Sequence, residues 1–140
     1  MLNAPFTELP YKPTVNSFLA GIDTEYKDDK FRCDLLKLDP NNQKDRVNII
    51  RRFIIKDLEY LTYRHKFILI EKLRTALGDK AFDFASYFDY DYEANEPSSS
   101  PWSSTEIHTP RSFFEDIFEV VSDAWGADLS KAASEDPATW

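Results

Sequence analysis

The chain has 140 residues, of which 42% are hydrophobic and 30% are charged, and its formal net charge is −8. This length suits one domain with its own core, and the apolar content excludes a chain that is disordered throughout. Three glycines are too few for a turn-rich all-β fold or for a glycine-rich phosphate-binding loop.

The charge is unevenly distributed along the sequence. Residues 41–80 carry ten basic and five acidic side chains, whereas residues 81–140 carry two basic and thirteen acidic ones. A strongly acidic segment repels nucleic acid and attracts basic proteins. We therefore expect a basic protein as partner and no direct contact with nucleic acid.

Cysteine usage and hydropathy indicate the compartment. Cys33 is the single cysteine, so no internal disulfide forms, and we expect it to be a small buried hydrophobic side chain. The first residues lack the pattern of a signal peptide, and the longest apolar run, residues 67–70, is far too short for a membrane span. These features predict a cytoplasmic protein without membrane contact.

The first forty residues predict an extended arm followed by two short helices. Residues 1–13 contain three prolines, and we expect their apolar side chains, including Phe6 and Leu9, to pack on the domain. Thr14 is a candidate cap for a helix that ends near Gly21. A second helix, capped by Asp23 or Thr24, would point three apolar side chains inward: Phe31, Leu35 and Leu36.

Two longer helices are expected in the middle of the chain. After a break at residues 38–42, the apolar residues of 43–60 follow the 3.6-residue period of a helix. Ile49 and Ile55 lie outside the apolar face that this period defines, which indicates that the helix is buried on more than one side. Thr62 is a candidate cap for a second helix over 63–77. Residues 63–70 are also rich in aromatic and β-branched types, so a strand is the alternative there.

The following segment combines aromatic and acidic residues. Residues 80–88 fit a short helix that buries Phe84 and Phe88, and residues 89–95 alternate acidic and aromatic side chains, as a short edge strand does. A Ser/Pro loop is expected over 96–110.

The last helix is the most clearly amphipathic element. Thr109 and Pro110 form a typical helix start, and the helix is expected to run to about Trp125 and to stop at Gly126. Residues 127–140 are expected to form a tail with at most one helical turn and a frayed Trp140. The whole pattern predicts a mainly α fold: one compact helical bundle over residues 1–140 with about four to six helices and at most a short edge strand.

The polar face of this last helix is almost entirely acidic. Glu115, Glu119 and Asp123 lie four residues apart, and like charges at that spacing cost roughly 0.2–0.5 kcal/mol per pair. Either the basic residues of 41–80 neutralise this face within the molecule, or the carboxylates await an external basic surface.

A second candidate interface lies in the aromatic and acidic segment. Five consecutive residues alternate carboxylates with tyrosines, and tyrosine is enriched at binding hot spots. Trp102, in the Ser/Pro loop, is either a plug into the core or an exposed anchor. The candidate partner-binding residues are therefore Asp89, Tyr90, Asp91, Tyr92, Glu93, Trp102, Glu115, Glu119 and Asp123.

No pattern in the sequence indicates a catalytic, cofactor or metal site. His65 and His108 show no ligand spacing, and Cys33 has no supporting motif for a nucleophilic pair. We therefore expect a protein that is not an enzyme and that needs no cofactor.

In size, acidity, aromatic content, single cysteine and helical pattern, the chain resembles the immunity proteins of bacterial polymorphic toxin systems, such as contact-dependent growth inhibition. The residues that carry the resemblance are 88–93 and the helix over 111–126. It implies a non-catalytic inhibitor that binds a cognate toxin domain and blocks its active site or substrate channel.

Two other binding functions fit the same features. A structural or adaptor subunit would use the same surfaces with modest affinity. An inhibitor that mimics DNA would need regularly spaced carboxylates over much of its surface, and the basic middle of the chain argues against that.

Overall fold

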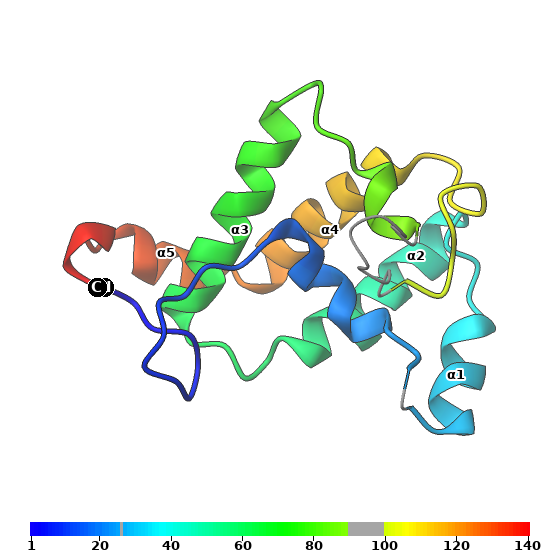
Figure 1. Cartoon of the computed structure of the whole chain (residues 1–140), viewed down its shortest axis with the longest axis horizontal. Helices are drawn as coiled ribbons and strands as arrows, with labels where there is room; N and C mark the ends of the chain where they lie inside the picture. Colours follow the sequence, from blue (N-terminus) through cyan, green and yellow to red (C-terminus); the bar gives the residue numbers. More distant parts are fainter. Residues whose placement is uncertain (26, 90–99) are drawn as a thin grey trace.

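Helix α3 (Tyr63–Gly78) is the central element of the computed structural model, which describes residues 1–25, 27–89 and 100–140. It contacts η1, α4 and α5 (Figure 1). The Thr62 hydroxyl caps it by accepting a hydrogen bond from the backbone N–H of His65, as the sequence predicts. Residues 63–70 are therefore helical, and the alternative of a strand is wrong.

The predicted helix over 43–60 is present as two consecutive segments. Helix α2 (Gln43–Ile49) begins after Asn42, whose side chain accepts from the backbone N–H of Asp45. It continues into η2 (Ile50–Ile55), a π-helical segment. Ile49 and Ile50 are both fully buried, which confirms that this helix is covered on more than one side.

The N-terminal helices differ from the prediction at their ends. The short 3₁₀ helix η1 (Val15–Ile22) includes Gly21 instead of ending before it. Helix α1 (Asp29–Leu36) is capped by Asp28, not by Asp23 or Thr24. Leu35 is fully buried, but Leu36 is 53% exposed, so its predicted inward position is wrong.

The C-terminal part contains more structure than the sequence predicts. Helix α4 (Pro110–Ala124) ends near Trp125 as expected, but Gly126 begins a further helix, α5 (Gly126–Ala133), which packs on α3. A 3₁₀ turn, η4 (Pro137–Thr139), follows. Trp140 is only 7% exposed, so the expected frayed tail is wrong.

An aromatic layer joins η3 (Ala85–Phe88) to α4. Phe84 and Phe88 are buried, as predicted, and their ring centroids lie 4.9 Å and 5.8 Å from that of Phe114. The expected edge strand over 89–95 falls almost wholly outside the described residues, and so does the first part of the 96–110 loop.

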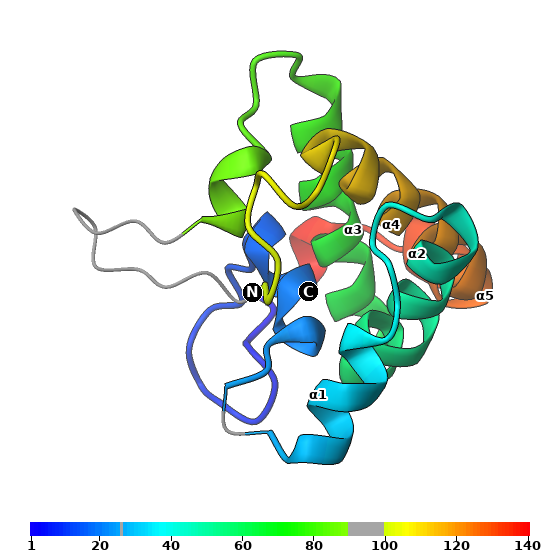
Figure 2. The ribbon, with the colours of Figure 1, turned by 90° about the vertical axis from the view of Figure 1, so that its right-hand side faces the viewer.

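The buried apolar side chains from η1 to Trp125 form one hydrophobic cluster. In the described residues the only β pairing is an isolated bridge between Asn3 and Pro10. The protein is thus a compact helical bundle, as the sequence predicts. Figure 2 shows the N-terminal segment and α4 on opposite sides of α3.

Candidate partner-binding surfaces

The predicted acidic face is found on α4. The helix buries Phe113, Ile117 and Val121 completely, which turns the opposite side outward. Glu115 and Glu119 are exposed there, and neither has an ion-pair or hydrogen-bond partner among the described residues. Together with Asp123 they are called the acidic crest below.

The flank of α4 that faces α2 and η2 is neutralised within the molecule. Arg46 is 6% exposed, and its guanidinium donates to the Asp116 carboxylate at 3.0 Å. Arg51 approaches Asp123 at 3.8 Å, but both side chains are largely exposed, at 50% and 81%. The basic residues of 41–80 therefore pair closely with Asp116 and only weakly with Asp123, and they leave Glu115 and Glu119 without a partner among the described residues.

On its other flank α4 meets basic side chains of α3. The Arg74 guanidinium lies 5.0 Å from the ring centroid of Phe118 and also pairs with Glu71 at 2.9 Å. Lys66 pairs with Asp128 of α5 at 2.7 Å and lies over the Trp125 ring. Both cations are thus engaged beside the crest, and Glu115 and Glu119 remain available to an external cation.

Asp89 has a partner inside the molecule. Its carboxylate accepts a hydrogen bond from the backbone N–H of Ser104 at 3.0 Å and one from the Ser104 hydroxyl at 2.6 Å. These hydrogen bonds, chiefly the one from the hydroxyl, lower the pKa of the Asp89 carboxyl. Through these two hydrogen bonds, Asp89 connects the end of η3 to the loop that follows Pro101. Residues 90–93 of the predicted interface lie outside the described residues.

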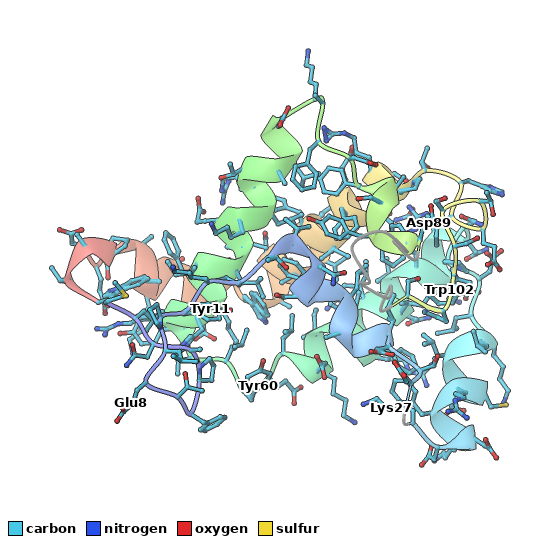
Figure 3. All side chains as sticks on the ribbon, viewed as in Figure 1. Glu8, Tyr11, Lys27, Tyr60, Asp89 and Trp102 are labelled. Atoms are coloured by element: carbon cyan, nitrogen blue, oxygen red, sulfur yellow. The ribbon has the colours of Figure 1, made fainter. Side chains whose placement is uncertain are left out.

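Trp102 is a plug into the core and not an exposed anchor. Its side chain is 7% exposed and belongs to the hydrophobic cluster, together with Ile107 of the same loop. The Ser100 hydroxyl accepts from the Trp102 N–H at 3.0 Å and donates to its carbonyl at 2.8 Å. Of the two alternatives for Trp102, the exposed anchor is therefore wrong, and its role in partner binding stays a prediction. Figure 3 labels Trp102 and Asp89 in the same region of the molecule.

A second surface, which the sequence does not predict, is the N-terminal loop, residues 3–10. Phe6 is 94% exposed and Leu9 is 69% exposed, although both are expected to pack. The loop is nevertheless held by its own backbone: the N–H of Ala4 donates to the Leu9 carbonyl at 2.7 Å and the N–H of Thr7 to the Ala4 carbonyl at 3.1 Å. The sequence gives little indication that Phe6 and Leu9 are exposed, because apolar residues near prolines normally cover a core.

His65 fixes this loop to α3. The His65 side chain is 6% exposed, and its Nε2 lies 2.7 Å from the carbonyl oxygen of Asn3. Its Nδ1 lies 2.6 Å from the Thr62 hydroxyl, and its ring meets the Tyr11 ring edge-on at 4.7 Å. His65 thus serves as a structural link between the helix start and the loop.

Beside the loop lies a groove of about 420 Å³. Its apolar lining includes Pro13, Leu58 and Leu61, and Tyr60 lies at its rim with 56% of its surface exposed. Burial, and secondarily the neighbouring Tyr60, raise the pKa of the Tyr11 phenol to about 12. Figure 3 shows Tyr11 and Tyr60 close together at the base of the loop and Glu8 at its outer edge.

The described residues contain neither a candidate metal-ion cluster nor a candidate membrane-spanning helix. No group of three or more His, Cys, Asp or Glu in ranges 1–25, 27–89 and 100–140 is placed to hold a metal ion. Within the same ranges, no helix combines the length and the apolar character that crossing a bilayer requires. Cys33 is exposed, so its predicted burial is wrong.

No protein-family model, no curated protein and no solved structure matches the chain. The charge, exposure and contacts of its own side chains therefore provide the clues to its function.

Proposed function

We propose that the chain is a non-catalytic inhibitor that binds a basic protein through the acidic crest, and that this protein is a cognate toxin domain. The observation that carries the proposal is the exposure of Glu115 and Glu119 without a partner among the described residues, on a helix where Arg46 pairs with Asp116 and Arg51 only approaches Asp123. Four residues apart on a helix, the two carboxylates stand about 6 Å from each other along its axis.

The energetics of the helix support an external role for these carboxylates. Two unbalanced like charges four residues apart destabilise a helix by roughly 0.2–0.5 kcal/mol, and a lysine at either position would remove that repulsion. A basic partner would remove it as well, and its long-range attraction to the acidic protein would accelerate association.

The support beneath the crest suits tight and specific binding. Phe113, Phe114 and Ile117 of the same helix are fully buried, so the backbone that carries the carboxylates is held in place. A preorganised surface loses little conformational entropy when it binds. A partner whose cationic cleft normally holds phosphate groups would meet carboxylates in a fixed geometry.

The charges around the crest favour a protein partner over the mimicry of DNA. Arg51 and Arg74 lie on opposite flanks of α4, so the acidic surface is a narrow ridge between basic side chains. A DNA mimic needs carboxylates over a wide area, whereas a ridge of this kind fits a local cationic site on a protein.

A charge-reversal experiment tests the interface. Glu115→Lys combined with Glu119→Lys should weaken partner binding at least about 100-fold at low salt while the circular dichroism spectrum and the unfolding midpoint are retained. The control is Glu25→Lys with Asp29→Lys, which changes two exposed acidic residues and the net charge by the same amount. If the crest variant and the control variant bind the partner equally well, α4 is not part of the interface.

A capture experiment tests the toxin part of the proposal. The tagged wild-type chain and the crest variant are used in parallel on extracts of the source cells, and the eluates are compared by intact mass. We expect a basic protein that the wild type retains and the crest variant loses. Its enzymatic activity should fall when one equivalent of the wild-type chain is added. A captured protein that stays fully active would support an adaptor role instead.

A further inference from the structure

The tip of the N-terminal loop holds an aromatic residue in an unfavourable backbone conformation. Phe6 has a φ of 63°, and it is the only non-glycine residue among those described with a positive φ. A bulky residue in this region costs roughly 1–2 kcal/mol relative to the usual conformations. The loop therefore keeps a strained backbone and projects a ring with 94% of its surface exposed to water.

A cavity of suitable character lies on the same face. The groove beside the loop has a volume of about 420 Å³ and is lined by Tyr11, Pro13, Leu58 and other largely apolar side chains. Pockets of this size, with apolar walls and few polar groups, take up aromatic side chains. Because Phe6 is almost fully exposed, its ring does not fill the groove of its own chain.

The charges on this face permit contact between two copies. Residues 1–22 contain one acidic and one basic side chain, Glu8 and Lys12, in a protein of net charge −8. The groove holds two charged residues of opposite sign, Lys12 and Asp57. Neither is in an ion pair among the described residues, although the charge of Lys27 partly offsets the burial that raises the pKa of Asp57. About a two-fold axis, Lys12 of one copy can face Asp57 of the other.

We propose that the N-terminal loop and its groove form a self-association surface, in which Phe6 of each copy enters the groove of the other. A projecting ring and an apolar groove on one face are the self-complementary elements that a two-fold symmetric contact requires. Helix α4, which carries the acidic crest, lies on the opposite side of α3 from the N-terminal segment (Figure 2), so the proposed dimer contact does not involve that helix. The proposal is therefore independent of the proposed inhibitor function.

The size of the contact predicts a weak dimer. A buried phenylalanine removes about 150–250 Å² from water, so two rings remove about 300–500 Å². The two grooves that cover them lose roughly the same area, which leaves the total below about 1,200 Å², in the range of weak, transient interfaces. We expect a dissociation constant on the order of micromolar and a dimer that dissociates on dilution.

Sedimentation velocity over a concentration series tests the proposal with Phe6→Asn. Asparagine tolerates a positive φ, so this variant should fold at least as stably as the wild type. Its dimer should be at least about 100-fold weaker, since each dimer loses two rings and each hot-spot truncation costs tenfold or more. The control is Leu36→Asn, which makes the same kind of change at a residue of α1 that is 53% exposed, and its dimerisation should be unchanged.

A complementation experiment identifies the contact itself. Ala20 is exposed and lines the groove, so Ala20→Arg should block the groove and also prevent dimerisation. A mixture of Phe6→Asn and Ala20→Arg chains regains one intact ring-to-groove contact per pair, and should associate more tightly than either variant alone. A wild-type chain that is monomeric at about millimolar concentration, or a dimer that Phe6→Asn leaves unchanged, would overturn the proposal. Loss of a different protein partner by Phe6→Asn in a monomeric chain would overturn it too.

Discussion

Gly21 of η1 lies directly against the carbonyl of Phe53 in η2. A Cβ atom at Gly21 would overlap the Phe53 carbonyl oxygen and would stand 3.0 Å from the Cβ of Asp57. The two helices can approach this closely only because residue 21, which lies within η1, has no side chain.

Gly21→Ala should therefore destabilise the protein by about 1–3 kcal/mol, because the helix backbones must move apart. Gly78→Ala is the matched control. Nothing lies within 4 Å of a Cβ at Gly78, and its φ is not positive, so this change should stabilise α3 by up to about 1 kcal/mol. Urea unfolding of both variants measures the difference, and equal stability would show that η1 and η2 are not in tight contact.

The buried Arg46 gives a second prediction about stability. Its guanidinium donates to the Pro40 carbonyl, the Ser112 hydroxyl and the Asp116 carboxylate at 2.7–3.0 Å. Asp116→Ala leaves a buried cation without its counter-charge, and we expect a loss of about 2–3 kcal/mol, since the other two acceptors remain. Asp123→Ala, which removes only the exposed pair with Arg51, should cost less than about 0.5 kcal/mol. Similar urea midpoints for the two variants would contradict this ranking.

The helices of the core could be predicted because their signals are local. Thr62 and Asn42 are capping residues directly before a 3.6-residue apolar period, and both cap as their types suggest. The amphipathic pattern of α4 likewise places Phe113, Ile117 and Val121 inside, so the exposure of Glu115 and Glu119 follows from the sequence.

The remaining features depend on contacts between distant residues. The pairing of Asp116 with Arg46 joins residues 70 positions apart, and only the overall charge distribution suggests it. Phe6 and Trp102 are both aromatic residues in Pro-containing loops, yet one is 94% exposed and the other 7%. No feature of the neighbouring sequence distinguishes the exposed Phe6 from the buried Trp102. The candidate interface on α4 could therefore be predicted from the sequence, whereas the one at the N-terminal loop could not.

The hydrogen bonds from Ser104 to Asp89 predict a pH dependence. They lower the pKa of Asp89 in the folded protein, so their contribution to stability is present above the unfolded value of about 3.9 and is lost as the pH falls through the lower folded value. Ser104→Ala should raise the pKa of Asp89 toward its ordinary value, which a carboxyl titration by NMR measures.

The neighbouring Ser103→Ala is the control for this titration, because the Ser103 hydroxyl contacts Thr105 and not Asp89. The stability difference between wild type and Ser104→Ala should shrink as the pH is lowered below about 4. A difference that stays constant from neutral pH to pH 2 would mean that the carboxylate and Ser104 do not interact.

Trp140 gives the last prediction, because its burial holds the C-terminal helix in place. Its indole N–H donates to the Glu135 carboxylate at 3.0 Å, and its ring meets the Phe67 ring edge-on at 5.7 Å. Glu135 also accepts from Arg64 at 2.9 Å, so these contacts join the segment that directly follows α5 to α3. Trp140→Ala should reduce stability by about 2–4 kcal/mol and increase hydrogen exchange of the α5 amides more than that of the α4 amides.

Thr139→Ala, which removes only a hydroxyl bonded to the Asp136 carbonyl, should cost less than about 1 kcal/mol. Unchanged exchange in α5 after Trp140→Ala would show that the helix is held by its own contacts with α3, among them the pair of Lys66 with Asp128.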